Sequence, residues 1–212
     1  MSTPIDGRTR KRLATRQLIS NAATRLFWER GFDQVTVDEI AAAAEVGRMT
    51  VFNHFRRKED MFFDREEEGR DVLRAALRER DPRVAPIEAL RLLAHRLVEQ
   101  RSPYTNFSPE SRSFIETIEG SETLVARARA IRDELAQVVA QALAEGVGRE
   151  AGDPAAHLAA GLLLATWAVA LVQAHRRYRE AGDAREAEAF FLALVDKGSL
   201  GARAALAGTP YA

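Results

Sequence analysis

The stretch Thr36–Lys58, TVDEIAAAAEVGRMTVFNHFRRK, predicts two short helices joined by a tight turn. Thr36 stands three residues before Glu39 and directly ahead of an apolar run, and this is the capping-box signature of a helix start. The inward faces of the two helices are marked by apolar residues four positions apart, Ile40 with Ala44 and then Val51 with Phe55.

The second helix, which is expected to begin near Gly47, directs Arg48, Met49, Phe52 and Asn53 outward. An arginine and an amide in the first turns of a solvent-facing helix are side chains that read base edges in a DNA major groove. Core packing does not require them at these positions. The stretch therefore predicts a DNA-reading helix.

With RLFWERGF (Arg25–Phe32) before it and FRRKEDMF (Phe55–Phe62) after it, this stretch resembles the amino-terminal domain of the TetR family of bacterial regulators. The resemblance covers about a quarter of the chain. It implies an all-α homodimer with an amino-terminal helix-turn-helix and a larger helical domain that binds a small molecule and releases the operator. Gly47 stands where the family usually has Ser or Thr, and Phe52 where it often has Tyr.

The candidate DNA contacts fall into two groups. The residues expected to face base edges are Arg48, Met49 and Asn53, with Thr50 near them. Those expected to face the backbone, in part through helix amino ends that present N–H groups to phosphate, are Thr36, Phe52, His54 and Lys58. His54 resembles the family's phosphate-contacting position.

Length and pattern predict two domains in these 212 residues, 46% of which are apolar. A helix-turn-helix DNA-binding domain is expected over 1–58, with 1–8 as a disordered arm, and a helical effector-binding and dimerisation domain over 59–212. The absence of cysteine excludes a disulfide framework and a thiolate metal site, and it fits a cytoplasmic location. The first twelve residues are polar and basic, without the apolar core of a signal peptide.

The net charge is zero, but its distribution is uneven. Residues 1–58 carry 11 Lys and Arg against 6 Asp and Glu, which gives +5, and residues 59–212 therefore carry −5. A locally basic segment provides attraction to phosphate, although +5 is also within a local fluctuation of composition. Whether the basic run Arg8–Arg12 contacts DNA stays open.

Further helices are expected over 59–80, 87–100, 112–119 and 124–142, and Asp153 followed by Pro154 marks another helix start. From Leu158 to Ala174 there is no charged residue, yet 17 residues are fewer than the roughly 20 that a membrane span needs. We interpret this segment as buried by a second subunit and not by a membrane. The expected assembly is a homodimer through the helices at about 154–180 and 185–196, bound to a partly palindromic double-stranded DNA operator.

The small-molecule effector is not identified by the sequence. Aromatic and weakly polar residues on inward faces are candidate pocket residues, although each is equally well an ordinary core residue; they are His95, Tyr104, Phe107, Phe114, Ile118 and Trp167. Because the four histidines are far apart in sequence and outside metal-ligand spacing, we expect no metal, no cofactor and no enzyme. The alternative function is a helical protein-interaction module that no longer binds DNA.

Overall fold

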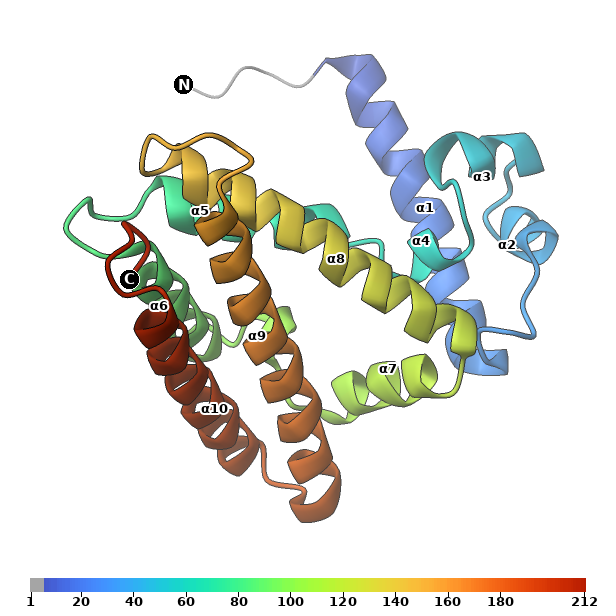
Figure 1. Cartoon of the computed structure of the whole chain (residues 1–212). Coiled ribbons are helices and arrows are strands. Elements are labelled where there is room, and N and C mark those ends of the chain that lie inside the picture. The colour runs from blue at the N-terminus through green and yellow to red at the C-terminus, as the bar shows by residue number, and fades with distance from the viewer. Residues whose placement is uncertain (1–5) are drawn as a thin grey trace. The chain divides into compact units, whose positions relative to one another are not determined.

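A computed structural model describes residues 6–212 of the chain (Figure 1). Within this range the regular structure consists of ten α-helices and one short 3-10 helix. The predicted all-α class is confirmed. Residues 1–5 of the expected arm lie outside the described residues. Residues 6–8 contradict the expectation of disorder, because Asp6 caps a helix that begins at Gly7 and accepts a hydrogen bond from the Thr9 amide at 2.7 Å.

The chain forms two compact units, and these differ from the sequence-based division after residue 58. The first unit comprises the chain up to Glu66 together with Thr117–Arg127, and the second comprises Glu67–Glu116 and Ala128–Ala212. Burial explains the difference, since Met61 and Leu124 lie in the hydrophobic core of the first unit with at most 1% of their surface exposed.

Four helices form most of the first unit: α1 (Gly7–Arg30), α2 (Val37–Ala43), α3 (Arg48–His54) and α4 (Glu59–Phe62). Helix α1 ends at Gly31, whose φ of 83° lies in the region that glycine adopts at little cost. The core between these helices is aromatic, with the rings of Phe27 and Phe32 at 5.0 Å and both close to Phe62. Ile40, Val51 and Phe55 close it from α2 and α3.

The single helix expected over 59–80 is interrupted, so that α4 ends at Phe62 and α5 (Glu66–Arg78) begins four residues later. The interruption follows from tertiary packing and not from a Gly or Pro. Phe63 leaves the helical conformation with ψ of 38° and lies edge-on to Phe62 at 5.2 Å. Asp64 then accepts a hydrogen bond from the buried Ser20 hydroxyl of α1.

The second unit is built from longer helices. Their bounds are α5 (Glu66–Arg78), α6 (Pro86–Glu99), the 3-10 helix η1 (Pro103–Thr105), α7 (Pro109–Glu119), α8 (Glu122–Glu145), α9 (Pro154–Ala181) and α10 (Ala184–Ala205). The end of α7 and the start of α8 belong to the first unit. Helix α10 continues nine residues beyond the predicted end at Asp196, because Ser199 and Ala202 extend its buried face.

Helices α9 and α10 lie side by side and antiparallel (Figure 1). Their approach is close at Gly198, where a Cβ atom would lie 2.2 Å from Cγ2 of Thr166. The carboxy-terminal turn folds back onto this unit, where the fully buried Tyr211 donates a hydrogen bond to Asp153, the N-cap of α9. The Tyr211 carbonyl accepts a hydrogen bond from the Ile87 amide at 3.3 Å.

Helix α9 is long and apolar enough to cross a membrane by length and composition alone, a test that core helices of soluble proteins also pass. Only 28% of its most apolar window is buried inside the chain. Leu158, Val169 and Val172 are each about half exposed on it. This apolar face has no cover within the described residues of one chain.

Candidate nucleic-acid interface

The first helix of the predicted pair is fixed at its start by the capping box. The Thr36 amide donates to Glu39 Oε2 at 2.8 Å, and the Glu39 amide donates to the Thr36 hydroxyl at 3.3 Å. Arg30 of α1 pairs with the same carboxylate at 2.8 Å. The hydrogen bonds from Thr36, followed by Arg30, lower the pKa of Glu39 to about 2. Glu39 therefore joins α2 to the end of α1.

A tight turn links α2 to α3. Glu45 has a φ of 53°, and the Val46 amide donates to the Ala41 carbonyl at 3.0 Å. Gly47 is the N-cap of α3 and supplies no side-chain hydrogen bond. Val51 is fully buried and Phe55 is 2% exposed, so one side of α3 is anchored in the core. The opposite side of this short helix faces solvent.

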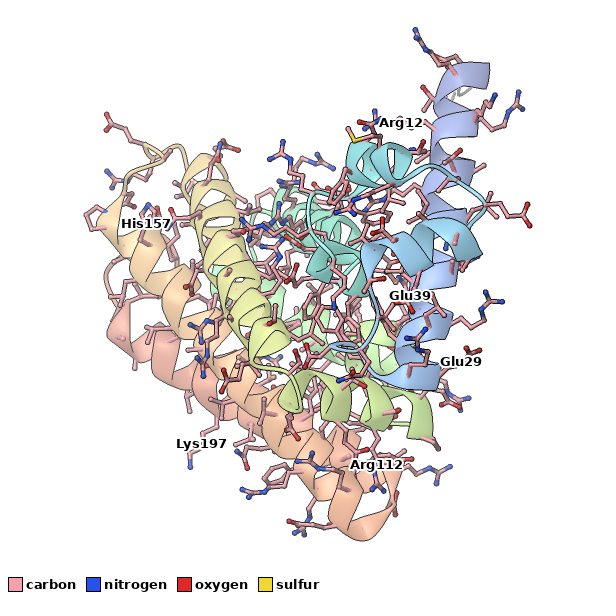
Figure 2. The ribbon with its side chains drawn as sticks, turned by 90° about the vertical axis from the view of Figure 1, so that its right-hand side faces the viewer. Arg12, Glu29, Glu39, Arg112, His157 and Lys197 are labelled. Carbon is pink, nitrogen blue, oxygen red and sulfur yellow. The ribbon has the colours of Figure 1, made fainter. Side chains whose placement is uncertain are left out.

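The solvent face of α3 carries the side chains that the sequence assigned to base edges. Met49 is 71% exposed, and Arg48, Phe52 and Asn53 are exposed as well, whereas Thr50 is half-buried. Arg48 Nη1 donates to Asp38 Oδ2 at 2.7 Å, an ion pair that joins α3 to α2. The guanidinium also lies 5.6 Å from the centre of the Phe52 ring. In Figure 2 Glu39 is labelled on α2 beside α1, on which Arg12 and Glu29 are labelled.

The last turn of α3 is held by α1. Arg16 Nη1 donates to the His54 carbonyl at 2.6 Å, and its guanidinium lies 4.0 Å from the centre of the Phe55 ring. Burial lowers the pKa of His54, and the positive charges of Arg12 and Arg16 lower it further. The half-buried imidazole is therefore neutral at pH 7 and, in the free protein, offers a hydrogen bond in place of a charge.

Lys58, which the sequence assigned to the DNA backbone, makes hydrogen bonds within the first unit. Its half-buried ammonium donates to the carbonyls of Phe32 at 2.9 Å and Val35 at 3.0 Å, and it lies 4.1 Å from the centre of the Phe32 ring. An ammonium group has three donors, so these carbonyls take two of them. In this conformation Lys58 mainly connects the loop before α2 to the start of α4 through these two hydrogen bonds.

Sequence reasoning missed three groups that hold the first unit together. Asp38 binds Arg48 at the start of α3, and Arg16 binds the His54 carbonyl at its end. The two residues of each pair are far apart in sequence, so no local pattern signals either pairing. The third group is the segment Thr117–Arg127. Within the first unit its Ser121 donates to Asp33 at 2.9 Å, and Arg127 pairs with two carboxylates, Asp60 at 3.2 Å and Glu66 at 2.8 Å.

The candidate effector residues do not form one group. Phe107 and Trp167 come together around Phe191, with ring centroids at 6.3 and 6.1 Å from it, and the buried His175 lies 4.8 Å from Phe107. Ile118 instead packs against the core of the first unit.

Three other candidates lie outside this aromatic cluster as well. Phe114 is half-buried on α7, and Tyr104 lies beside Gly69. His95 belongs to a half-exposed polar cluster in which Asp196 accepts from Arg91 and contacts His95, each at 2.8 Å. Within residues 6–212 no group of three His, Cys, Asp or Glu side chains is arranged to hold a metal ion.

Comparison with known proteins agrees with the geometry of the first unit. Residues 19–64 match the family model described as bacterial regulatory proteins, tetR family. Among curated protein sequences, none matches this chain.

Solved structures of similar fold cover most of the chain. SmeT, the repressor of the Stenotrophomonas maltophilia multidrug efflux pump SmeDEF, is 21% identical with a TM-score of 0.53, covering 88% of this chain and 89% of that chain. The SmeT–triclosan complex gives 21% identity and a TM-score of 0.55 over 89% and 91%. Thermus thermophilus FadR, a TetR-family transcriptional repressor in complex with lauroyl-CoA, is 25% identical with a TM-score of 0.51 over 86% and 94%.

An exposed reading face on a short helix, anchored on a capped partner helix and an aromatic core, defines a helix-turn-helix DNA-binding protein. Residues 19–64 therefore form a DNA-binding domain of the bacterial tetR family, and the fold of the chain is similar to that of a solved TetR-family repressor. The family assignment made from the sequence is confirmed, and it favours DNA binding over the protein-interaction module.

Proposed function

We propose that the protein is a homodimeric, cytoplasmic repressor that leaves a partly palindromic operator when its second unit binds a small, mostly apolar molecule. The observation that carries this proposal is the solvent face of α3, where Arg48, Met49 and Asn53 are exposed together on a helix fixed from both ends. All three are solvent-exposed, and Arg48, although paired with Asp38 through one of its five donors, keeps the others for a base edge.

In this proposal the phosphate contacts come from the edges of the same face. Thr36 at the start of α2 and His54 at the end of α3 flank the reading helix, and Phe52 adds an apolar contact. Lys58 retains one ammonium donor for phosphate, but its larger effect is on the loop that it joins to α4. We therefore expect Arg48→Ala to relax preference at one base pair by about 1–3 kcal/mol, and Lys58→Ala to lower both affinity and the stability of the first unit.

Dimerisation is supported by the uncovered apolar face of the last two helices. On α9 the exposed residues recur at steps of three and four and are apolar or small: Leu158, Gly161, Ala165, Val169 and Val172. On the adjacent α10 the exposed residues at the same spacing are Phe190, Ala193, Lys197 and Leu200; Lys197 is the charged one, and Figure 2 shows it pointing away from the helix pair. A second copy that covers this face would bury it as a four-helix bundle does.

The dimer is tested with matched charge insertions measured by light scattering after size exclusion. Leu200→Glu places a carboxylate on the apolar face, and Leu18→Glu places one at a similarly exposed leucine of α1. We expect a dimer for the parent chain and for Leu18→Glu, and a monomer for Leu200→Glu. If the Leu200→Glu variant were still a dimer, the interface would have to lie on another surface.

The effector is proposed to bind near the aromatic cluster of Phe107, Trp167, His175 and Phe191. The related repressors bound to triclosan and to lauroyl-CoA supply two probes, with coenzyme A alone as the control. Because the chain has two tryptophans, Trp28→Phe leaves Trp167 as the single tryptophan. A probe that changes Trp167 fluorescence and also releases DNA supports the site, whereas a response carried by Trp28 alone would contradict it.

The deciding experiment is fluorescence anisotropy with DNA from immediately upstream of the gene and with scrambled DNA of equal length, over a salt series. Two protomers per site, a preference for the upstream DNA and steep weakening with salt are the expected results. Absence of binding, repeated after selection from random sequences, would instead favour the protein-interaction module.

A further inference from the structure

The ion pair between Arg48 and Asp38 bears on whether the Arg48 guanidinium binds a base edge or a phosphate. The two side chains are 59% and 63% exposed and come from different helices, with 2.7 Å between Nη1 and Oδ2. Asp38 takes no part in the capping box, which uses the neighbouring Glu39. Its carboxylate is therefore directed to the guanidinium of the residue that begins α3.

We propose that Asp38 is a specificity-determining residue, which acts by making Arg48 a poor partner for phosphate while leaving it able to read a base. This inference rests on the proposed placement of Arg48 against DNA. A guanidinium has five donors, of which this pair engages one, so a second edge remains for a guanine, whose N7 and O6 accept two parallel hydrogen bonds.

The Asp38 carboxylate opposes the binding of a phosphate to Arg48. A phosphate is an anion, so it must either displace the Asp38 carboxylate from Arg48 or come to rest beside it, and both alternatives are unfavourable. A guanine edge is neutral and does not carry this repulsion. Asp38 therefore weakens the phosphate contact of Arg48, which any DNA offers, more than its base contact, which the preferred sequence offers. The ratio of the affinity for preferred DNA to the affinity for scrambled DNA rises as a result.

The size of the effect follows from the exposure of the pair. Exposed ion pairs interact weakly because water screens them, so we expect a change of about 2- to 5-fold in affinity and not a loss of binding. Freeing Arg48 for one additional phosphate contact also steepens the dependence of log affinity on log salt by about 1.

The test is Asp38→Asn, which removes the charge and keeps the shape, assayed on the preferred and on scrambled duplexes over a salt series. Binding to scrambled DNA is expected to strengthen about 2- to 5-fold with a steeper salt dependence, while the preference ratio falls. Glu45→Gln is the matched control, because Glu45 is an exposed carboxylate of the α2–α3 turn. It raises the net charge equally, and we expect it to leave the ratio unchanged.

A double-variant cycle separates the pair from a general effect. In an Arg48→Ala background Asp38→Asn should no longer alter the preference ratio. The inference is overturned if Asp38→Asn weakens both duplexes by the same factor, matches Glu45→Gln, or still lowers the ratio without Arg48. Failure of the parent chain to prefer any duplex would instead overturn the proposed function, so the two failures are distinguishable.

Discussion

The close approach of α9 and α10 at Gly198 gives a stability prediction with a matched control. Gly198→Ala would place a Cβ atom 2.2 Å from Cγ2, 2.5 Å from Oγ1 and 2.9 Å from Cβ of Thr166. Thr166 cannot move aside easily, because its side chain is branched at Cβ and its hydroxyl donates to the Leu162 carbonyl at 2.8 Å. Something in the helix pair must therefore shift.

Gly69→Ala is the control, since its Cβ would meet the nearest atom, Cε1 of Tyr104, at an ordinary 3.5 Å. Both glycines are helical and lie in the second unit, so both substitutions gain about 1 kcal/mol of helix propensity. Their difference isolates the cost of overpacking, which is typically about 1–3 kcal/mol and is expected here near the upper end. Gly198→Ala should thus be less stable than the parent chain, and Gly69→Ala equally or more stable.

Urea unfolding followed by circular dichroism measures both variants, and the slope against denaturant checks that the unfolding transition is unchanged. Thr166→Ala removes Cγ2 and Oγ1 but keeps Cβ, so the double variant should recover part of the free energy that Gly198→Ala loses. Equal stability of Gly198→Ala and Gly69→Ala, or no recovery in the double variant, would refute the close packing of α9 on α10 at this point.

Three further predictions concern caps and titrating groups. Thr36→Ala should lower the stability of the first unit by about 1 kcal/mol in urea unfolding, whereas the exposed Thr24→Ala should not. Burial and the bond to Asp153 raise the pKa of Tyr211 to about 12. The free energy of unfolding that Tyr211 contributes relative to Tyr211→Phe should therefore be constant below pH about 10, the pKa in the unfolded chain. It should be lost as pH rises toward 12. Because a bound phosphate favours the charged imidazole, DNA affinity should rise as pH falls through 6.5, the ordinary pKa of histidine, and His54→Gln should abolish that rise.

Local patterns predicted most of the α2–α3 region correctly. The capping box of Thr36 and Glu39, and the buried pair Val51 and Phe55, depend on residues within four positions of one another, and the structure contains both. The N-cap Asp153 followed by Pro154 likewise gave the start of α9. Local patterns could not give the break at Phe63, because the sequence there carries no helix-breaking residue.

The sequence by itself therefore determined the helical class, the family and the face of α3 that meets solvent, since hydrogen bonds and side-chain spacing within one helix act over a few residues. Only the tertiary structure decided that Lys58 binds carbonyls of a preceding loop, that Arg48 pairs with Asp38, and that Thr117–Arg127 belongs to the first unit. These choices depend on which polar groups the folded chain brings within 3 to 4 Å, and spacing along the sequence carries no record of that distance.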